Sequence, residues 1–405
     1  MDWTSLFASR VSRMKASEIR ELLKLLDQPD VISFAGGIPD SHLFPTEAVS
    51  AAYARALQSG AADVALQYSV SEGYRPLREW IVGEMAKLGI PSKIENVLIT
   101  SGSQQVLDFL GKLLLSPGDT ALVTWPTYLG ALGAFNAYEP NYDRLSVHDN
   151  RAPAAIAEAA KARGGAVKFA YCVPEFHNPT GETMSLAERV NLLDLAEALE
   201  IAVIEDAAYQ ALRYDGTPLP SVLALDIARH GGDIEKARTL YCGTFSKTLA
   251  PGLRIGWVVG PQEVISKLVL TKQATDLHSS TVNQMVVPDI ASTLFDEQVE
   301  KIKVAYANRR NRMLAALEAK MPKGITWTHP EGGMFVWVTL PDGYDGASLL
   351  AEALRSEKVA FVPGRAFFPD GSGGNTLRLS FSCASEQMID EGIKRLGRLL
   401  RRTAD

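Results

Sequence analysis

Apolar runs alternate with helical patterns along most of the chain. Six apolar segments predict β-strands: Val97–Thr100, Ala121–Thr124, Val167–Val173, Ile201–Ile204, Thr239–Cys242 and Ile255–Val259. Several of them are almost continuously apolar, which is typical of strands covered on both faces. Helical patterns separate most of the strands, and Ser185 with Glu188 forms a capping box at the start of one helix. This alternation favours an α/β fold with a mostly parallel sheet.

The pattern changes beyond about residue 290. A long charged helix is expected over roughly 295–320, and a final helix from about Ser385. Between them the sequence predicts strands at Met334–Leu340, near Val359–Val362 and at Thr376–Phe381. We therefore expect a large α/β domain, whose central sheet is mostly parallel and covered by helices, and a small α+β domain.

Composition and charge narrow the class of protein. The 405 residues suffice for two domains, and 46% of them are hydrophobic. Because 41 basic residues face 47 acidic ones, no basic excess exists to bind nucleic acid. The uncharged stretch Thr120–Tyr138 contains Pro126 and Gly130, which indicate a strand, a turn and a helix start. We expect no nucleic-acid partner and no membrane span.

The three cysteines suggest the compartment. Cys172, Cys242 and Cys383 lie far apart and have neither zinc-site spacing nor a disulfide framework. The N-terminus lacks the basic and apolar regions of a signal peptide. These features predict a cytoplasmic protein without a metal site.

One lysine stands in an unusual setting at a strand end. Lys247 follows the strand Thr239–Cys242, with Ser246 before it and Arg254 seven positions after it. Such an amine can form a Schiff base with an aldehyde cofactor, while the hydroxyls and the guanidinium hold a phosphate. A surface lysine in a loop is the alternative.

A pair of acids ends the strand Ile201–Ile204. Active sites of open α/β sheets gather at the carboxyl ends of strands, so Asp206 could pair with a protonated pyridine nitrogen. Tyr209, three residues later, could donate to a phenolic oxygen. For Glu205, a solvent-facing strand end is a fair alternative.

Two further loops follow predicted strands. Asn178 begins the segment Asn178–Gly181, and the proline after it favours an extended backbone at Asn178. The Asn178 side-chain amide could hold a ring oxygen. Ser103 and Gln104 lie at the start of an apolar helix, whose exposed N–H groups favour an anion. A common turn and a plain N-cap loop are the alternatives.

The last candidate is a charge inside an apolar strand. Arg378 lies in Thr376–Phe381, where an unpaired charge is costly. A ligand carboxylate bound by both arms of the guanidinium would resolve this, and so would an internal salt bridge.

Taken in their order along the chain, these motifs resemble those of the fold-type I pyridoxal-phosphate aminotransferases of class I/II. The resemblance covers nearly the whole chain. A closer resemblance is to the kynurenine/2-aminoadipate aminotransferase subgroup. The segments that carry it are Ser17–Leu23, Ser33–Pro39, Leu66–Ser69, Glu72–Tyr74 and Gly332–Trp337. His177 departs from the subgroup, which usually has glutamine there.

The resemblance implies pyridoxal 5'-phosphate as the cofactor and a role for each matching residue. Lys247 would bind the cofactor aldehyde and shuttle the proton, while Asp206 would face the pyridine nitrogen. Asn178 and Tyr209 would face the ring oxygen, and Tyr128 would stack on the ring. The phosphate would be held by Ser103, Gln104, Ser246 and Arg254.

The resemblance also implies how the substrate and a second subunit contribute. Arg378 would bind the substrate α-carboxylate with help from Asn178 and the backbone of Gly37, and Tyr68 would cross to the partner's phosphate in an obligate homodimer. The small domain would join residues 1–45 to 291–405, around a large cofactor-binding domain at 46–290. The expected reaction passes the amino group of an L-amino acid to a 2-oxo acid such as 2-oxoglutarate, by a ping-pong mechanism.

Three other readings stay open at this stage. The same cofactor fold supports β-lyases and decarboxylases. A pyridoxal-phosphate-sensing transcription regulator would carry a DNA-binding domain ahead of this region, whereas here the resemblance begins almost at Met1 and the chain is acidic.

Arg20 is expected either on a solvated helix face or beside the donor's side chain, where it would pair with the distal carboxylate of 2-aminoadipate or glutamate. The sequence leaves the donor open among 2-aminoadipate, kynurenine, aromatic and branched-chain amino acids.

Overall fold

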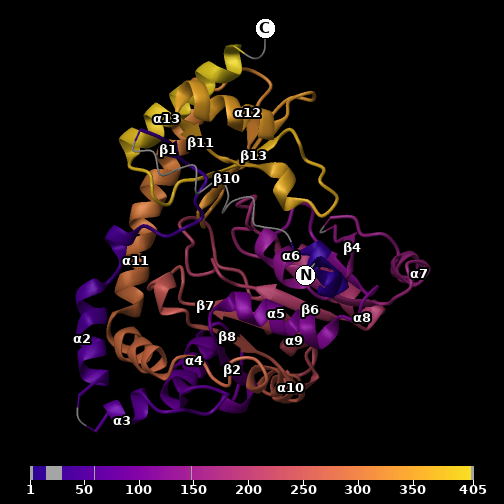
Figure 1. Cartoon of the computed structure of the whole chain (residues 1–405), viewed down its shortest axis with the longest axis vertical. Helices are drawn as coiled ribbons and strands as arrows, with labels where there is room; N and C mark the ends of the chain where they lie inside the picture. Colours follow the sequence, from indigo (N-terminus) through magenta and orange to yellow (C-terminus); the bar gives the residue numbers. More distant parts are fainter. Residues whose placement is uncertain (1–2, 15–29, 59, 147, 403–405) are drawn as a thin grey trace.

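The computed structural model describes residues 3–14, 30–58, 60–146, 148–402 of the chain. Two regions, each with its own sheet, lie side by side and are linked by a long helix, α11 (Figure 1). The larger region holds a seven-stranded sheet, and the smaller holds sheets of four and two strands. This confirms the α/β fold class.

The seven-stranded sheet has the order β2-β8-β7-β6-β5-β3-β4. Only β8 runs against its neighbours β2 and β7, so the other six strands of this sheet are parallel. Their bounds are Val97–Thr100 (β2), Thr120–Val123 (β3), Asn141–Arg144 (β4), Val167–Cys172 (β5), Ala202–Asp206 (β6), Thr239–Thr244 (β7) and Gly256–Val259 (β8). The six predicted strands are confirmed within two residues at each end, and β4 is an addition. The carboxyl ends of the six parallel strands therefore meet at one edge.

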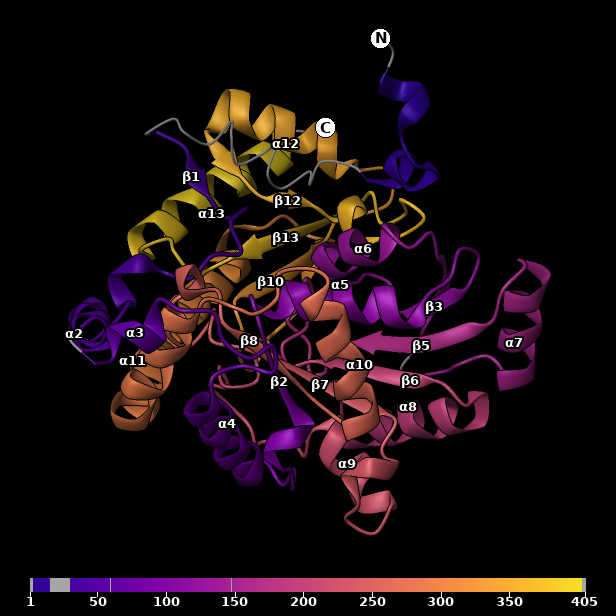
Figure 2. The ribbon, with the colours of Figure 1, turned by 60° about the horizontal axis from the view of Figure 1, so that its bottom comes forward.

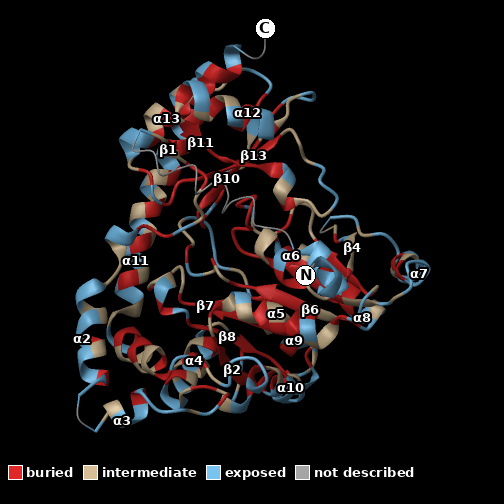
Figure 3. Cartoon of the chain, in the orientation of Figure 1, coloured by how far each residue is buried: buried red, intermediate tan, exposed pale blue. Residues whose placement is uncertain are grey.

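Helices cover both faces of this sheet (Figure 2). One face packs on α5 (Ser103–Leu114), α6 (Leu129–Asn136) and α10 (Gln262–Gln273), and the other on α4 (Arg75–Lys87), α7 (Pro153–Ala162), α8 (Leu186–Leu199) and α9 (Val222–Arg229). The predicted capping box is present: the Ser185 hydroxyl accepts from the Glu188 N–H, and the Glu188 carboxylate accepts from the Ser185 N–H. The strands β2, β3, β7 and β8 are buried along their length, and β5 and β6 are buried except at their first residues (Figure 3).

The smaller region combines both ends of the chain. Its four-stranded sheet has the order β12-β13-β10-β9, and its two-stranded sheet pairs β1 with β11 in parallel. The bounds are Ile32–Ser33 (β1), Thr326–Trp327 (β9), Phe335–Thr339 (β10), Val359–Ala360 (β11), Val362–Pro363 (β12) and Thr376–Ser380 (β13), with helices Gly346–Glu352 (α12) and Glu386–Arg402 (α13). The N-terminal segment therefore enters this region through β1, as the resemblance implied.

The helix α11 spans Thr281–Lys320, with Pro288 inside it. The sequence predicted a helix only over roughly 295–320, so the helix begins earlier than expected and continues through Pro288. The helix packs on α13 in the smaller region and on α2 (Thr46–Ala56), α3 (Ala62–Ala65) and α4 in the larger. The domain boundaries 45/46 and 290/291 stay a prediction, and the second lies within α11. In the part of the chain that the structure describes, no helix is both long and apolar enough to cross a membrane.

Candidate active site

The predicted site residues come from loops at the carboxyl edge of the larger sheet. Asp206 ends β6, Lys247 follows β7 by three residues, and Ser103 follows β2 by three. Asn178 and Tyr128 lie in the loops that follow β5 and β3. Because these five strands are parallel, their loops open toward the same side, where active sites of open α/β sheets form.

Lys247 reaches into the space between the two regions. Its Nζ donates to the backbone oxygen of Gly37 at 3.2 Å and lies 5.7 Å from the centre of the Tyr209 ring. Exclusion of water and the nearby Arg378 charge lower the pKa of Lys247 to about 8. A lowered pKa leaves a larger fraction of the amine neutral near neutral pH, and the neutral amine is the nucleophile.

Asp206 is only 3% exposed and has two unlike oxygens. Oδ2 accepts a hydrogen bond of 2.9 Å from the Tyr171 hydroxyl, whereas Oδ1 has no partner among the described residues. Burial raises the pKa of Asp206 to about 6, although the bonds from Tyr171 and the Ala208 N–H oppose the rise. A buried carboxylate oxygen without a donor is costly, so this oxygen favours a ligand that brings an N–H group.

Arg378 is tied to Asn178 and Tyr209 in one chain of hydrogen bonds. Its Nη1 donates to Asn178 Oδ1 at 2.9 Å, and Asn178 Nδ2 donates to the Tyr209 hydroxyl oxygen at 3.2 Å. Its Nη2 donates to the Ala35 backbone oxygen at 2.8 Å. The guanidinium lies between the rings of Phe335 and Phe367, 4.3 and 5.1 Å from their centres.

No carboxylate of the described chain pairs with Arg378, although the residue is 2% exposed. The internal salt bridge that was the alternative at this position is therefore absent from these residues. Burial lowers the pKa of Arg378 to about 10, and its Nε lacks a partner in the same part of the chain. A buried cation in this state favours an anionic ligand.

The strands β2, β8 and β7 lie side by side at the start of α5. The register places Thr100, Gly256 and Thr244 side by side on β2, β8 and β7. A Cβ on Gly256 would lie 2.6 Å from the Ser103 nitrogen, so only glycine permits this approach. The sheet therefore brings the helix start next to the loop after β7.

Arg254 and Ser246 border this helix start. Arg254 Nη2 donates to the Ser101 backbone oxygen at 3.1 Å, and a Cβ on Gly102 would collide with the guanidinium. The Ser246 hydroxyl accepts from the Thr244 hydroxyl at 2.9 Å. Hydroxyls, backbone N–H groups and a guanidinium around a helix N-terminus form a suitable cradle for a phosphate.

The remaining predicted residues differ in how the structure places them. Gln104 Nε2 donates to the Gly130 backbone oxygen at 2.7 Å, and the Tyr128 ring lies so close to Gly130 that a side chain there would collide with it. A Cβ on Gly37 would lie 3.1 Å from the Phe335 ring. Tyr68 is 80% exposed and meets the His278 ring edge-on, so the described chain does not bring it to Lys247. Arg20 lies outside the described residues.

Comparison with known proteins identifies the family. The family model "Aminotransferase class I and II" matches residues 29–396. The chain belongs to the class I and II aminotransferases. It is 41% identical to aromatic-amino-acid aminotransferase 1 of Thermococcus litoralis, over 99% of this chain and 95% of that one.

Two solved aminotransferases share the fold. The alpha-aminoadipate aminotransferase of Thermus thermophilus, complexed with N-(5'-phosphopyridoxyl)-L-leucine, has 40% identity and a TM-score of 0.89, with 100% of this chain and 99% of that one covered. The kynurenine aminotransferase of Pyrococcus horikoshii, in complex with PMP, has 42% identity and a TM-score of 0.90 at the same coverage.

This aminotransferase uses pyridoxal phosphate as its cofactor, and the residues present fit it. The Lys247 amine suits an aldehyde, and the unpartnered Asp206 Oδ1 suits a protonated ring nitrogen. The cradle at the start of α5 suits a phosphate dianion.

Sequence reasoning missed two groups of residues in the aminotransferase site. Tyr171 is the hydrogen-bond donor to Asp206, and Phe335 and Phe367 enclose Arg378. The signal for Tyr171 was its place near the end of a predicted strand, but the register with β6 is needed to find its partner. A solvent-facing strand end was the alternative for Glu205, but Glu205 is buried and accepts from the Val222 and Leu223 N–H groups at the start of α9.

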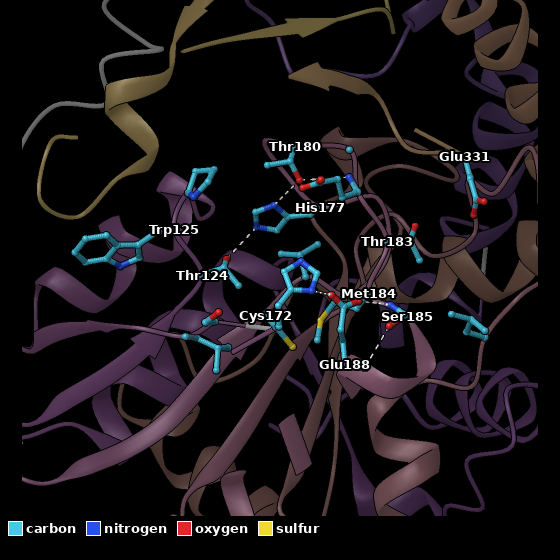
Figure 4. A pocket seen from close by; sticks show the side chains of 18 of the residues that line it. Thr124, Trp125, Cys172, His177, Thr180, Thr183, Met184, Ser185, Glu188 and Glu331 are labelled. Carbon is cyan, nitrogen blue, oxygen red and sulfur yellow. Dashed lines mark hydrogen bonds and ion pairs between the residues drawn. The ribbon is translucent and has the colours of Figure 1, made fainter. Parts of the chain in front are cut away.

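A cavity of about 650 Å³ lies beside the site, over the ends of β3, β4 and β5 (Figure 4). His177, which precedes Asn178 in the sequence, is one of the residues that line it. The imidazole bridges two hydroxyls, with Nε2 3.2 Å from Thr124 Oγ1 and Nδ1 3.1 Å from Thr180 Oγ1. Burial lowers the pKa of His177 to about 4, so the ring is neutral at neutral pH.

Proposed function

We propose that this aminotransferase moves the amino group of an L-amino acid to a 2-oxo acid, with 2-oxoglutarate as the acceptor, by a ping-pong mechanism. The observation that carries the proposal is Arg378: a buried guanidinium without an acidic partner in the described chain, tied to Asn178 beside Lys247. A substrate α-carboxylate placed on Arg378 would bring the α-carbon toward the lysine amine.

The donors we propose are 2-aminoadipate, aromatic and branched-chain amino acids. The names of the similar proteins, which include aromatic-amino-acid, alpha-aminoadipate and kynurenine aminotransferases, support this range. The buried rings of Phe335 and Phe367 fix the carboxylate end of the donor and leave its side chain to be recognised elsewhere.

The residues of the site divide the work among them. When bound, pyridoxal phosphate supplies an aldehyde that accepts the amino group and a ring that withdraws electrons. Asp206 Oδ1 holds the ring N–H, and Asn178 with Tyr209 donates to the ring oxygen. Ser103, Gln104, Ser246 and Arg254 bind the phosphate, and Tyr128 covers the ring.

Lys247 moves the proton. Its Nζ takes the proton from the donor's α-carbon and later returns one, and a pKa near 8 suits both directions near neutral pH. Gly37 keeps Nζ in place through its backbone oxygen at 3.2 Å, and Arg378 and Asn178 hold the donor so that its α-hydrogen points at the amine.

A homodimer with composite sites completes the proposal. Val64, Leu66, Tyr68 and Val70 are all more than half exposed, and Leu66 and Tyr68 reach 74% and 80%. Apolar residues gathered on one exposed segment favour a protein interface, and an interface there would carry Tyr68 to the partner's phosphate. We place the enzyme in the cytoplasm, since its three cysteines are all unpaired.

The test is a panel of amino donors with 2-oxoglutarate as acceptor. Each donor is mixed with the holoenzyme, and the cofactor spectrum is followed through a single turnover. We expect the spectrum of the amine form with acidic, aromatic or branched-chain donors, and its return on adding 2-oxoglutarate. Release of ammonia or carbon dioxide without glutamate formation would instead assign a lyase or a decarboxylase.

A further inference from the structure

We propose that Tyr171 is a positioning residue for Asp206: its hydroxyl fixes one carboxylate oxygen so that the other one faces the cofactor's ring nitrogen. The inference rests on the proposed role of Asp206. It adds a role for Tyr171, the residue that donates a hydrogen bond to Asp206. Tyr171 bonds to the Asp206 carboxylate, so it acts through that group.

The pairing of β5 and β6 places the two residues on one face of the sheet. Tyr171 is opposite Ile204 in the parallel register, and side chains two residues apart share a face. Asp206 therefore lies diagonally next to Tyr171, and the hydroxyl donates to Oδ2 at 2.9 Å. The next pair in the register, Cys172 and Glu205, points to the opposite face.

Packing around the Tyr171 ring also holds its hydroxyl in place. Tyr171 is fully buried, and its ring meets the Phe135 ring edge-on with centres 5.7 Å apart. A rigid ring whose hydroxyl has one charged acceptor selects one rotation of the carboxylate. Oδ1 is then the oxygen left without a partner, as the structure shows.

The same bond keeps Asp206 ionised. Burial raises the pKa of the carboxyl group, and the hydrogen bond from Tyr171 is the largest influence that opposes the rise. The other titratable or charged groups around Asp206 and Tyr171 are Lys247, Tyr128, Tyr209, Tyr241, Cys172 and Cys242, with Glu205 next to the two cysteines. Of these, Lys247 also favours the anion, so loss of the hydroxyl raises the pKa of Asp206 further toward neutral pH.

A second buried tyrosine supplies the matched control. Tyr241 lies on β7, the strand on the other side of β6, and it is 3% exposed. Its hydroxyl donates to the neutral Gln210 Oε1 at 2.6 Å, and its register partner is Glu205 rather than Asp206. Tyr241→Phe therefore removes a buried hydroxyl from the same sheet without touching the Asp206 bond.

The experiment measures cofactor binding to the apo-protein. The dissociation constant of pyridoxal phosphate is determined by equilibrium dialysis for wild type, Tyr171→Phe, Tyr241→Phe, Asp206→Asn and the double variant Tyr171→Phe/Asp206→Asn. Thermal unfolding of each apo-protein reports whether it is folded, and the bound cofactor's spectrum is titrated against pH. A charged hydrogen bond of this kind corresponds to about tenfold in affinity.

We expect Tyr171→Phe to weaken binding about tenfold and to move the spectroscopic titration, because both depend on the Asp206 charge. Tyr241→Phe should alter neither, and Tyr171→Phe should add nothing once Asp206→Asn is present. Equal losses in the two tyrosine variants, or a full additional loss in the double variant, would overturn the inference. If Asp206→Asn alone binds like wild type, the proposed role of Asp206 fails instead.

Discussion

Asp206 and Tyr68 belong to the same proposed site but lie in opposite surroundings. Asp206 is 3% exposed and is held by its own chain through Tyr171 and the Ala208 N–H. Tyr68 is 80% exposed and has an edge-on ring contact with His278. The residues that would hold the cofactor ring are thus prearranged within one chain, whereas a residue proposed for the phosphate projects away from it.

This difference predicts which substitutions should abolish transamination and which should only lower its rate or change its substrate preference. Substitutions at buried site residues such as Lys247 and Asp206 remove groups that the chain itself holds in place. Substitutions at Tyr68 or Arg20 act on contacts that depend on a second subunit or on the donor.

Lys247→Ala should abolish transamination, because it removes the amine that moves the proton at the site. The variant should still bind pyridoxal phosphate. In the wild type, borohydride reduction should fix the cofactor to the peptide that contains Lys247. Lys272 is the informative competitor, since its Nζ lies near the phosphate cradle but is bonded to Asp276 at 2.9 Å. Label on the Lys272 peptide would contradict the assignment.

Asp206→Ala should lower kcat by about a hundred- to a thousandfold, within the range that a preorganised charge supplies. The neighbouring Glu205→Gln is the control. Glu205 accepts two backbone N–H groups of α9 at 2.9 Å each, so its replacement should cost about 1–2 kcal/mol of stability and leave kcat unchanged. Steady-state rates and thermal unfolding separate the two effects, and a loss of rate in both variants would count against a special role for Asp206.

Arg20→Ala should lower kcat/KM for 2-aminoadipate and glutamate by about ten- to a hundredfold and spare leucine and phenylalanine. A partly desolvated charge pair with the donor's distal carboxylate has about that effect. The residue lies outside the described chain, so the prediction depends on the resemblance. Equal losses for every donor would point to damage elsewhere, and no loss would assign Arg20 to a solvated face.

Tyr68→Phe should reduce activity about tenfold, and a mixing experiment tests whether the loss belongs to the partner. When Tyr68→Phe chains exchange with inactive Lys247→Ala chains, each heterodimer has one doubly altered site and one intact site. About a quarter of wild-type activity should return if subunits mix at random. Absence of recovery after verified exchange would place Tyr68 in its own chain's site.

The smallest expected effect concerns His177 and pH. Its pKa is about 4 in the folded chain against 6.5 ordinarily, so the unfolded chain takes up the proton first as the pH falls. Stability should therefore decrease from pH 6.5 to 4, by at most about 3 kcal/mol from this residue. His177→Gln should flatten that decrease while retaining activity, because an amide can also bridge Thr124 and Thr180. Identical pH profiles of unfolding would contradict this.

Much of the fold follows from local patterns. The apolar runs predicted six strands of the larger sheet, and the capping box located the start of α8. The strand β4 was missed because Asn141–Arg144 is a polar edge strand with an ordinary loop composition. The start of α11 was missed because packing on four other helices tolerates Pro288.

For the site, the sequence indicated which residue types stand at strand ends but not what they touch. Glu205 and Asp206 are adjacent and chemically alike, yet they point to opposite faces of β6, one to a helix N-terminus and one to the site. Only the register with β5 and the position of α9 distinguish them. In the same way, Arg378 has no acid beside it among the described residues, and this depends on elements hundreds of residues apart.

The hydrogen bond from Arg378 to the Ala35 backbone joins residues 343 positions apart, and β1 pairs with β11 over a similar span. During synthesis the segment around Ala35 and Gly37 is made early, but its partners are among the last to leave the ribosome. Contacts this distant in sequence form slowly and late. The carboxylate-binding end of the site should therefore form late, so that capture of an amino acid marks a chain in which these distant contacts have been made.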